Sequence, residues 1–158
     1  MKDFETPDYP ESIGGCRTFS FTPVKFIEFI PEPVNGIIDS DIRFFPDGRM
    51  YQGYSTKGVL SFSETAKITP SGLIYTVIMK GFSPGNNEGM VALFDMMAKN
   101  RFVLLVTDNQ GVTRLVGSKK EPLSFTADFS TGINPGDRMG YTYAFEGNLT
   151  SPSPVYAP

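Results

Sequence analysis

EGMVALFDMMAKNRFVLLVTDNQGVTRLVGSKKEPLSFTADFSTGINPGDRMGYTYAFEG, residues 88–147, is the stretch that decides the fold. It opens with an amphipathic helical pattern and continues with an apolar run at 101–106, which is typical of a central strand. The sequence DNQG at 108–111 predicts a tight turn, from which a short partner strand returns. Two segments that alternate apolar and polar residues follow at 123–129 and 141–145, and they predict half-buried strands.

The helix is predicted near 88–99. Its large apolar residues recur at helical spacing and would place one stripe against a sheet: Met90, Leu93, Phe94 and Met97. Asn86 or Asn87 can cap its start, and Asn100 can end it. The methionines of this segment are interpreted as core-filling residues, since a Met-rich binding groove is the less common use.

Working back toward the N-terminus, the period-two pattern predicts further strands at 17–21, 25–30, 41–45, 49–54, 58–62 and 71–82. The turn sequence PDG at 46–48 would return 49–54 antiparallel to 41–45. The predicted fold class is therefore mainly β. We expect an antiparallel β sandwich or small barrel of about eight strands with one packed α-helix.

The two ends of the chain differ from this central β domain, which spans 17–147. Residues 1–16 are polar and contain prolines and adjacent glycines, so they predict an extended N-terminal arm. Residues 148–158 hold Pro152, Pro154 and Pro158, which disfavour helix and central strand and predict an extended, proline-rich C-terminal tail. We expect contacts with neighbouring copies or partner proteins to hold both ends in place.

The composition excludes several classes of function. The 158-residue chain has no histidine, which excludes Ser-His-Asp and Cys-His catalysis and histidine-ligated metal sites. Its one cysteine, Cys16, cannot form an intrachain disulfide. A formal net charge of -3 gives no basic footprint for gripping nucleic acid. No apolar run reaches the length of a membrane span, and the first residues lack the apolar core of a signal peptide, so we expect neither a membrane partner nor secretion.

The few candidate chemical groups each have a simpler structural interpretation. Asp39, Asp41 and Asp47 lie close in sequence but lack the ligand spacing of a calcium loop, so we interpret them as turn residues. Cys16 lies beside Arg17 but has no base partner, and no glycine-rich phosphate-binding motif occurs. The sequence therefore assigns no catalytic, cofactor-binding or metal-binding residue.

The second half of the chain carries a family resemblance. Its segments are GLIY at 72–75, RFVLLVTD at 101–108, RLVG at 114–117, LSF at 123–125, STG at 130–132, DR at 137–138 and GYTYAFEG at 140–147. Together they resemble small virion proteins of tailed bacteriophages that infect Bacteroidetes. The resemblance covers roughly 72–156, and the first 70 residues do not share it. It implies a tail-tube-like fold, which occurs in tail tube, tail terminator and neck proteins.

This resemblance implies a non-enzymatic structural protein that forms a ring in the phage tail or the head-tail neck. Its partners would be copies of itself, with six-fold or twelve-fold symmetry, and other tail or neck proteins. DNA would be only a passing cargo, and no cofactor is implied. The protein would be assembled in the cytoplasm of the bacterial host and reside in the virion. The segment at 31–54 is the candidate loop for stacking on a neighbouring ring.

A ring subunit buries apolar and aromatic residues of its arms and loops against neighbours. The candidate subunit contacts are Phe4, Tyr9, Val34, Ile37, Ile38, Tyr51, Tyr54, Val155 and Tyr156. The alternative hypothesis is a carbohydrate-binding or adhesin-like β-sandwich module, in which Tyr51, Tyr54 and Tyr75 would stack on sugar rings. Cross-strand packing is the commoner use of tyrosine in such proteins, which favours the ring subunit.

Overall fold

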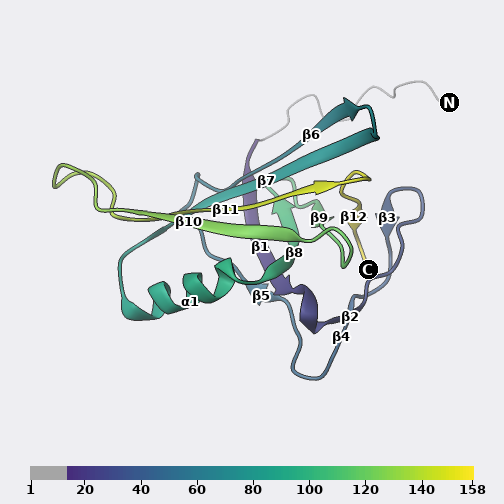
Figure 1. Cartoon of the computed structure of the whole chain (residues 1–158), viewed down its shortest axis with the longest axis horizontal. Helices are drawn as coiled ribbons and strands as arrows, with labels where there is room; N and C mark the ends of the chain where they lie inside the picture. The colour runs from purple at the N-terminus through teal and green to yellow at the C-terminus, as the bar shows by residue number, and fades with distance from the viewer. Residues whose placement is uncertain (1–13) are drawn as a thin grey trace.

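The computed structural model describes residues 14–158, which form a β-rich body with one helix (Figure 1). Most of the N-terminal arm expected at 1–16 lies outside the described residues, and the first strand begins at Cys16. The elements are β1 (Cys16–Pro23), β2 (Ile27–Phe29), β3 (Ile37–Ile38), β4 (Arg43–Phe44), β5 (Tyr51–Gln52), β6 (Ser61–Thr69), β7 (Gly72–Pro84), α1 (Glu88–Ala98), β8 (Arg101–Asp108), β9 (Thr113–Val116), β10 (Leu123–Ser130), β11 (Gly140–Leu149) and β12 (Val155–Tyr156). The predicted fold class, mainly β with one helix, is confirmed.

The strands form two layers that join at one corner. One layer has the order β5-β1-β8-β9-β12-β3. The other, which we call the edge layer, has the order β10-β11-β7-β6. The layers join where Arg101 and Phe102 of β8 pair with Ser124 and Leu123 of β10. Neighbouring strands run antiparallel except β12 and β3, which are parallel. The result is a β sandwich.

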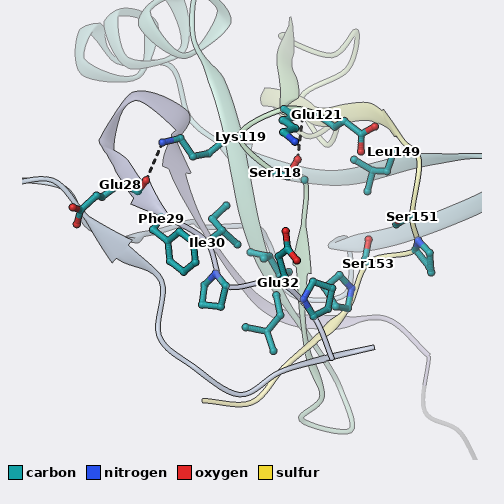
Figure 2. A pocket seen from close by; sticks show the side chains of 18 residues that line it. Glu28, Phe29, Ile30, Glu32, Ser118, Lys119, Glu121, Leu149, Ser151 and Ser153 are labelled. Atoms are coloured by element: carbon teal, nitrogen blue, oxygen red, sulfur yellow. Dashed lines mark hydrogen bonds between the residues drawn. The ribbon is translucent and has the colours of Figure 1, made fainter. Parts of the chain in front are cut away.

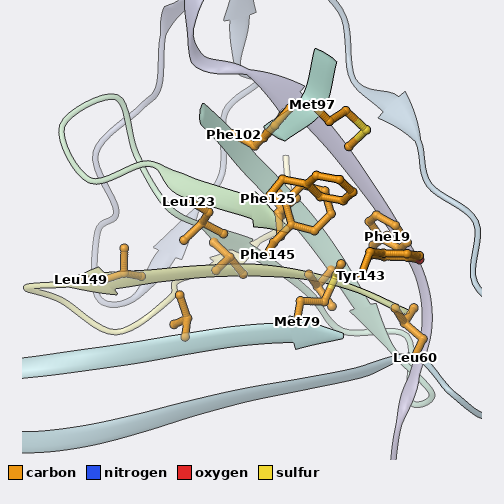
Figure 3. Close-up of a cluster of buried hydrophobic side chains, with 14 residues drawn as sticks. Phe19, Leu60, Met79, Met97, Phe102, Leu123, Phe125, Tyr143, Phe145 and Leu149 are labelled. Carbon is orange, nitrogen blue, oxygen red and sulfur yellow. The ribbon is translucent and has the colours of Figure 1, made fainter. Parts of the chain in front are cut away.

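The core lies between the two layers because their strands alternate apolar and polar side chains. Phe145 of β11 is 1% exposed, and its ring centre lies 5.5 Å from that of Phe102 on β8. Phe19 of β1 approaches Phe145 at 6.0 Å, so aromatic rings from both layers interlock (Figure 3). The opposite face of β8 is also buried, since Val103 packs with Ile27 in a second apolar cluster.

The helix α1 occurs where its apolar spacing predicts it. The Asn87 side chain caps its first turn by accepting a hydrogen bond from the Met90 backbone N–H at 2.9 Å. Phe94 packs edge-on against Tyr141 of β11, with ring centres 4.9 Å apart. The predicted apolar stripe therefore does face a sheet, although Leu93 within it is 42% exposed.

The hairpin predicted across 46–48 does not form. β5 pairs with β1 instead, and the Tyr51 ring stacks on Phe21 with centres 6.0 Å apart. β4 pairs with β2, outside the main sheet. The physical reason is that pairing with β1 places Tyr51 on the aromatic core, which a local hairpin at the surface would not do. The strand predicted at 58–62 also runs further, because β6 continues to Thr69 and forms a hairpin with β7.

The C-terminal segment is anchored on its own chain. The sequence instead predicted that contacts with neighbouring copies or partner proteins hold it in place. β11 continues to Leu149, so the strand overlaps the tail predicted from 148. β12 then inserts between β9 and β3 and holds β3 to the sheet. The prolines of this segment do not prevent the pairing, since they lie outside the two residues of β12.

Candidate assembly interface

Two strand edges in the edge layer have no strand partner among the described residues. β6 pairs with β7 along one side, and no strand pairs with its other side within residues 14–158, although Cys16 contacts the backbone of Leu60 and Phe62 at the start of β6. β10 pairs with β8 only through Leu123 and Ser124, so 126–130 have no strand beside them on that side within residues 14–158. Open edges present N–H and C=O groups that can pair with another chain. These two edges are the candidate assembly sites, and α1 packs beside one of them, with Phe94 against Phe125 of β10.

The face of the edge layer that points away from the core is mixed, since strand pairing also places the half-buried Ile74 and Ile78 of β7 on it. It carries two lysines, Lys67 and Lys80, and two acids, Asp128 and Glu146, all of them exposed. Strand pairing places these residues on the side opposite the buried Phe145, since Lys80 lies across from Ala144, and Glu146 lies across from Ser124. The formal charges of these four side chains cancel, so this face has no dominant sign.

The connection between β10 and β11, residues 131–139, forms a structured projection that we call the hairpin tip. The Asp137 carboxylate accepts hydrogen bonds from the backbone N–H groups of Ile133 and Asn134, both at 2.8 Å. These bonds lower the pKa of Asp137, the one from Asn134 contributing most, because they stabilise the ionised carboxylate. Gly132 has φ of +73°, and a side chain there would meet Asp137, so glycine is required.

The hairpin tip presents two large apolar side chains to solvent, of which Ile133 is the more exposed. Ile133 is 96% exposed, and Met139 at the base of the tip is 45% exposed. Figure 1 shows the tip at one end of the long axis of the molecule, well away from the sandwich. A single exposed apolar residue is common on protein surfaces. Here, however, the hydrogen-bonded turn around Asp137 fixes the position of Ile133 at the end of the projection. The tip is therefore a second candidate contact.

A groove of about 350 Å³ lies at the other end of β11, and we call it the end groove (Figure 2). Its walls come from three connections, at 28–33, 117–121 and 149–154. Its apolar lining includes prolines and aliphatic side chains: Phe29, Ile30, Pro31, Pro33, Leu115, Leu149, Pro152 and Pro154. The volume lies in the range of ligand-sized clefts.

Hydrogen bonds fix the polar rim of the end groove. Lys119 Nζ donates to the Glu28 carbonyl oxygen at 3.0 Å and joins two of the walls. The Glu121 carboxylate accepts from the Thr150 N–H at 3.1 Å and joins the third. The Glu32 side chain also lines the groove. The rim is therefore held open by contacts between its own walls.

Five of the predicted contact residues lie together at this end of the molecule. Val155 and Tyr156 of β12 pair with Ile37 and Ile38 of β3. Ile38 is only 1% exposed and belongs to the second apolar cluster, so its side chain stabilises the fold rather than the surface. Val34 and Ile37, which are 69% and 47% exposed, are the two residues of this group that solvent reaches most.

The other predicted contacts are dispersed. Tyr51 is half-buried against Phe21, and Tyr54, 63% exposed, lies beyond β5. These tyrosines therefore do not form a flat exposed platform. Phe4 and Tyr9 lie outside the described residues.

The titratable groups with shifted pKa values are parts of the packing. The Tyr143 hydroxyl donates to the Tyr54 carbonyl oxygen, and burial raises the pKa of Tyr143 above its ordinary value. Burial also raises the pKa of the Cys16 thiol, and the nearby Asp108 carboxylate adds to this shift. In the described part of the chain, no three side chains of His, Cys, Asp or Glu gather where a metal ion could bind.

No protein-family model matches the chain, and no curated protein or solved structure matches it. Within residues 14–158, no helix has the length and apolar content that crossing a bilayer requires. The features of the chain that bear on its function are therefore its unpaired strand edges, its hairpin tip and its end groove.

Sequence reasoning missed the hairpin tip and the end groove. The signal for the tip was available, since Ile133 is the one aliphatic residue in the Gly-, Pro- and Asn-containing stretch TGINPGDR at 131–138. The groove had no comparable signal, because its three walls are up to 126 positions apart between Glu28 and Pro154. Only the fold brings them together.

Proposed function

We propose that this chain is a non-enzymatic structural subunit that assembles with copies of itself into a ring in the tail or head-tail neck of a bacteriophage. The observation that carries the ring is that β6 and β10, on opposite sides of one four-stranded layer, each have a side without a strand partner within residues 14–158. The place in a phage rests on the resemblance of residues 72–156. An edge that pairs with a different edge of the next copy makes a heterologous contact, and such contacts generate rings when the rotation closes.

The strand directions of the edge layer suit this assembly. The three pairings from β10 through β11 and β7 to β6 are all antiparallel, so β10 and β6 run in opposite directions. Rotation about a ring axis along the strands preserves the direction of each strand. The β10 strand of one copy would therefore lie antiparallel to the β6 strand of the next, and the layers would join into one continuous sheet.

The shape of the subunit favours one orientation in such a ring. The other layer and α1 add bulk on the core side of the edge layer, and the outer circumference of a ring has more room for that bulk. The face with Lys67, Lys80, Asp128 and Glu146, which also carries Ile74 and Ile78, would then line the central channel. Balanced charges there would let DNA pass without the strong phosphate contacts of a nucleic-acid-binding protein.

The alternative, a carbohydrate-binding module, is placed second. Sugar stacking uses exposed aromatic faces, but Tyr51 stacks on Phe21 and Tyr75 packs against the core cluster. Tyr54 is the more exposed of the three tyrosines considered for this role. A glycan array tests this directly: the ring subunit should bind no glycan, and specific binding would favour the module.

Electron microscopy of the purified chain over a range of concentrations tests the ring proposal. The expected result is closed rings of uniform diameter that contain only this chain. Particles of monomer size at every concentration, together with absence of the protein from virions, would contradict it. If the unpaired edges lead only to non-specific aggregation, the images should instead show irregular clusters and no closed rings.

A further inference from the structure

The hairpin tip and the end groove lie at opposite ends of the same strand. The tip precedes β11 at Gly140, and the groove is lined by Leu149 at the other end of that strand. Ten residues in extended conformation span about 30 Å, so the tip of a chain cannot reach the groove of the same chain. Figure 1 shows β11 running from the hairpin tip along the long axis of the molecule.

We propose that the hairpin tip of one copy docks in the end groove of a copy in the adjacent ring, with Ile133 as the inserted side chain. This inference rests on the proposed ring function and assigns the contact that stacks one ring on the next. It takes the place of the stacking loop expected at 31–54, where β3, β4 and β5 pair within the chain. An apolar projection that fits a groove elsewhere on the same molecule makes a contact that does not close, and repetition extends the assembly along one direction.

The chemistry of the two surfaces is complementary. Ile133 is 96% exposed, and the groove offers apolar walls that include Pro31, Leu149 and Pro152. Burying an exposed aliphatic side chain removes its whole surface from water, and this is the dominant favourable term in protein association. The turn around Asp137 fixes the Ile133 backbone beforehand, which lowers the conformational entropy lost on docking.

The charges around the two surfaces also match. Arg138 is exposed on the hairpin tip, five residues after Ile133. Glu28 and Glu32 are exposed on the groove rim, which also carries the exposed Lys119 and Lys120 (Figure 2). Among residues 14–158 the one ion pair joins Lys99 to Asp95, so both glutamates lack a cationic partner within that part of the chain. A docked tip would bring Arg138 toward these carboxylates, which fixes the orientation of the contact.

The test is a disulfide between copies. In a Cys16→Ser background, which removes the one native cysteine, the variant carries Ile133→Cys on the tip and Ser151→Cys on the exposed groove wall. A disulfide requires the two Cα atoms to lie within about 7 Å, so the two positions cannot be bridged within one chain. The matched control pairs Ser151→Cys with Val91→Cys, since Val91 is an exposed apolar residue on α1.

The expected result is a ladder of covalent oligomers on a non-reducing gel for the tip-groove pair and little beyond monomer for the control pair. Rings seen by electron microscopy, but with equal crosslinking in both pairs, would overturn the stacking contact and leave the ring proposal intact. A protein that stays monomeric and forms no ladder would overturn both. A third variant, Ile133→Asp, should leave single rings but abolish their stacks.

Discussion

Ser153 donates two hydrogen bonds to the same carboxylate oxygen of Glu64, one from its backbone N–H at 2.8 Å and one from its hydroxyl. Ser153 is 3% exposed and belongs to the segment before β12, whereas Glu64 belongs to β6. This contact ties the C-terminal segment to the edge layer across 89 positions of sequence. One acidic side chain therefore adds to the anchoring that the strand pairing of β12 provides.

Replacing that side chain should destabilise the fold. Glu64→Ala leaves two buried donors of Ser153 without a partner, and we expect a loss of about 2 kcal/mol in the free energy of unfolding. Urea denaturation measures this value, and hydrogen exchange should show increased opening of β12. The control is Glu146→Ala on the exposed face of β11, which should change stability by less than about 0.5 kcal/mol. Equal effects in both variants would contradict the role of the contact.

The buried hydroxyl of Tyr143 should make the free energy of unfolding fall at alkaline pH. Because burial raises the pKa of its hydroxyl above the ordinary 10.0, its contribution is fully present below pH 10 and is lost as the pH rises through the folded-state pKa. Tyr143→Phe removes the hydrogen bond to Tyr54 and should cost about 1 kcal/mol at neutral pH. Above pH 10 the variant should lose stability less steeply than the wild type. Parallel pH profiles of the unfolding free energy would contradict this explanation.

Asp137 should control the order of the hairpin tip without controlling the fold. Asp137→Ala removes the acceptor for the N–H groups of Ile133 and Asn134, so their amide exchange should accelerate while the unfolding midpoint stays unchanged. Asp137→Asn keeps a carbonyl acceptor and should preserve much of the protection. In the wild type the lowered pKa of Asp137 means that protection is fully present above pH 3.8 and is lost only as the pH falls through the lower, folded-state pKa. Nuclear magnetic resonance measures these rates, and unchanged rates in Asp137→Ala would refute the assignment.

Local patterns predicted the elements that depend on neighbouring residues. The helical spacing that ends at Met97 and the cap at Asn87 both appear in the structure, and the turn at 108–111 joins β8 to β9. Pairings that depend on distant residues were not predictable in the same way. Tyr51 pairs with Phe21 across 30 positions, because burial beside the aromatic core outweighs the local turn at 46–48.

The predicted contact residues show the same difference between what local patterns predict and what long-range packing decides. The sequence predicted subunit contacts at Val34 and Ile37, which are exposed. It predicted one at Ile38 as well, but that side chain is buried in the second apolar cluster. The alternation of apolar and polar residues predicts which side chains of a strand face the core. It does not predict which strand lies at the edge of a sheet. The open sides of β6 and β10 follow from the order of the whole layer, and that order is set by long-range pairings.

The edge of β6 can be blocked by one substitution. Thr69 and Gly72 face each other across a two-residue turn, and such flanking residues form a hydrogen-bonded pair. Alternation from that pair makes the N–H of Ala66 point toward the open side. Ala66 is exposed, and proline is tolerated at an edge where the lost N–H faces solvent. Ala66→Pro should therefore fold normally but lose a donor needed by the next copy, whereas Ala66→Val keeps that donor.

Sedimentation velocity of the wild type, Ala66→Pro and Ala66→Val is the most direct test of edge-to-edge ring assembly. Circular dichroism and urea denaturation first establish that all three chains fold. The expected result is one large, discrete species for the wild type and Ala66→Val, and monomer or short open oligomers for Ala66→Pro. A folded Ala66→Pro variant that forms the same large species as the wild type would contradict pairing through β6.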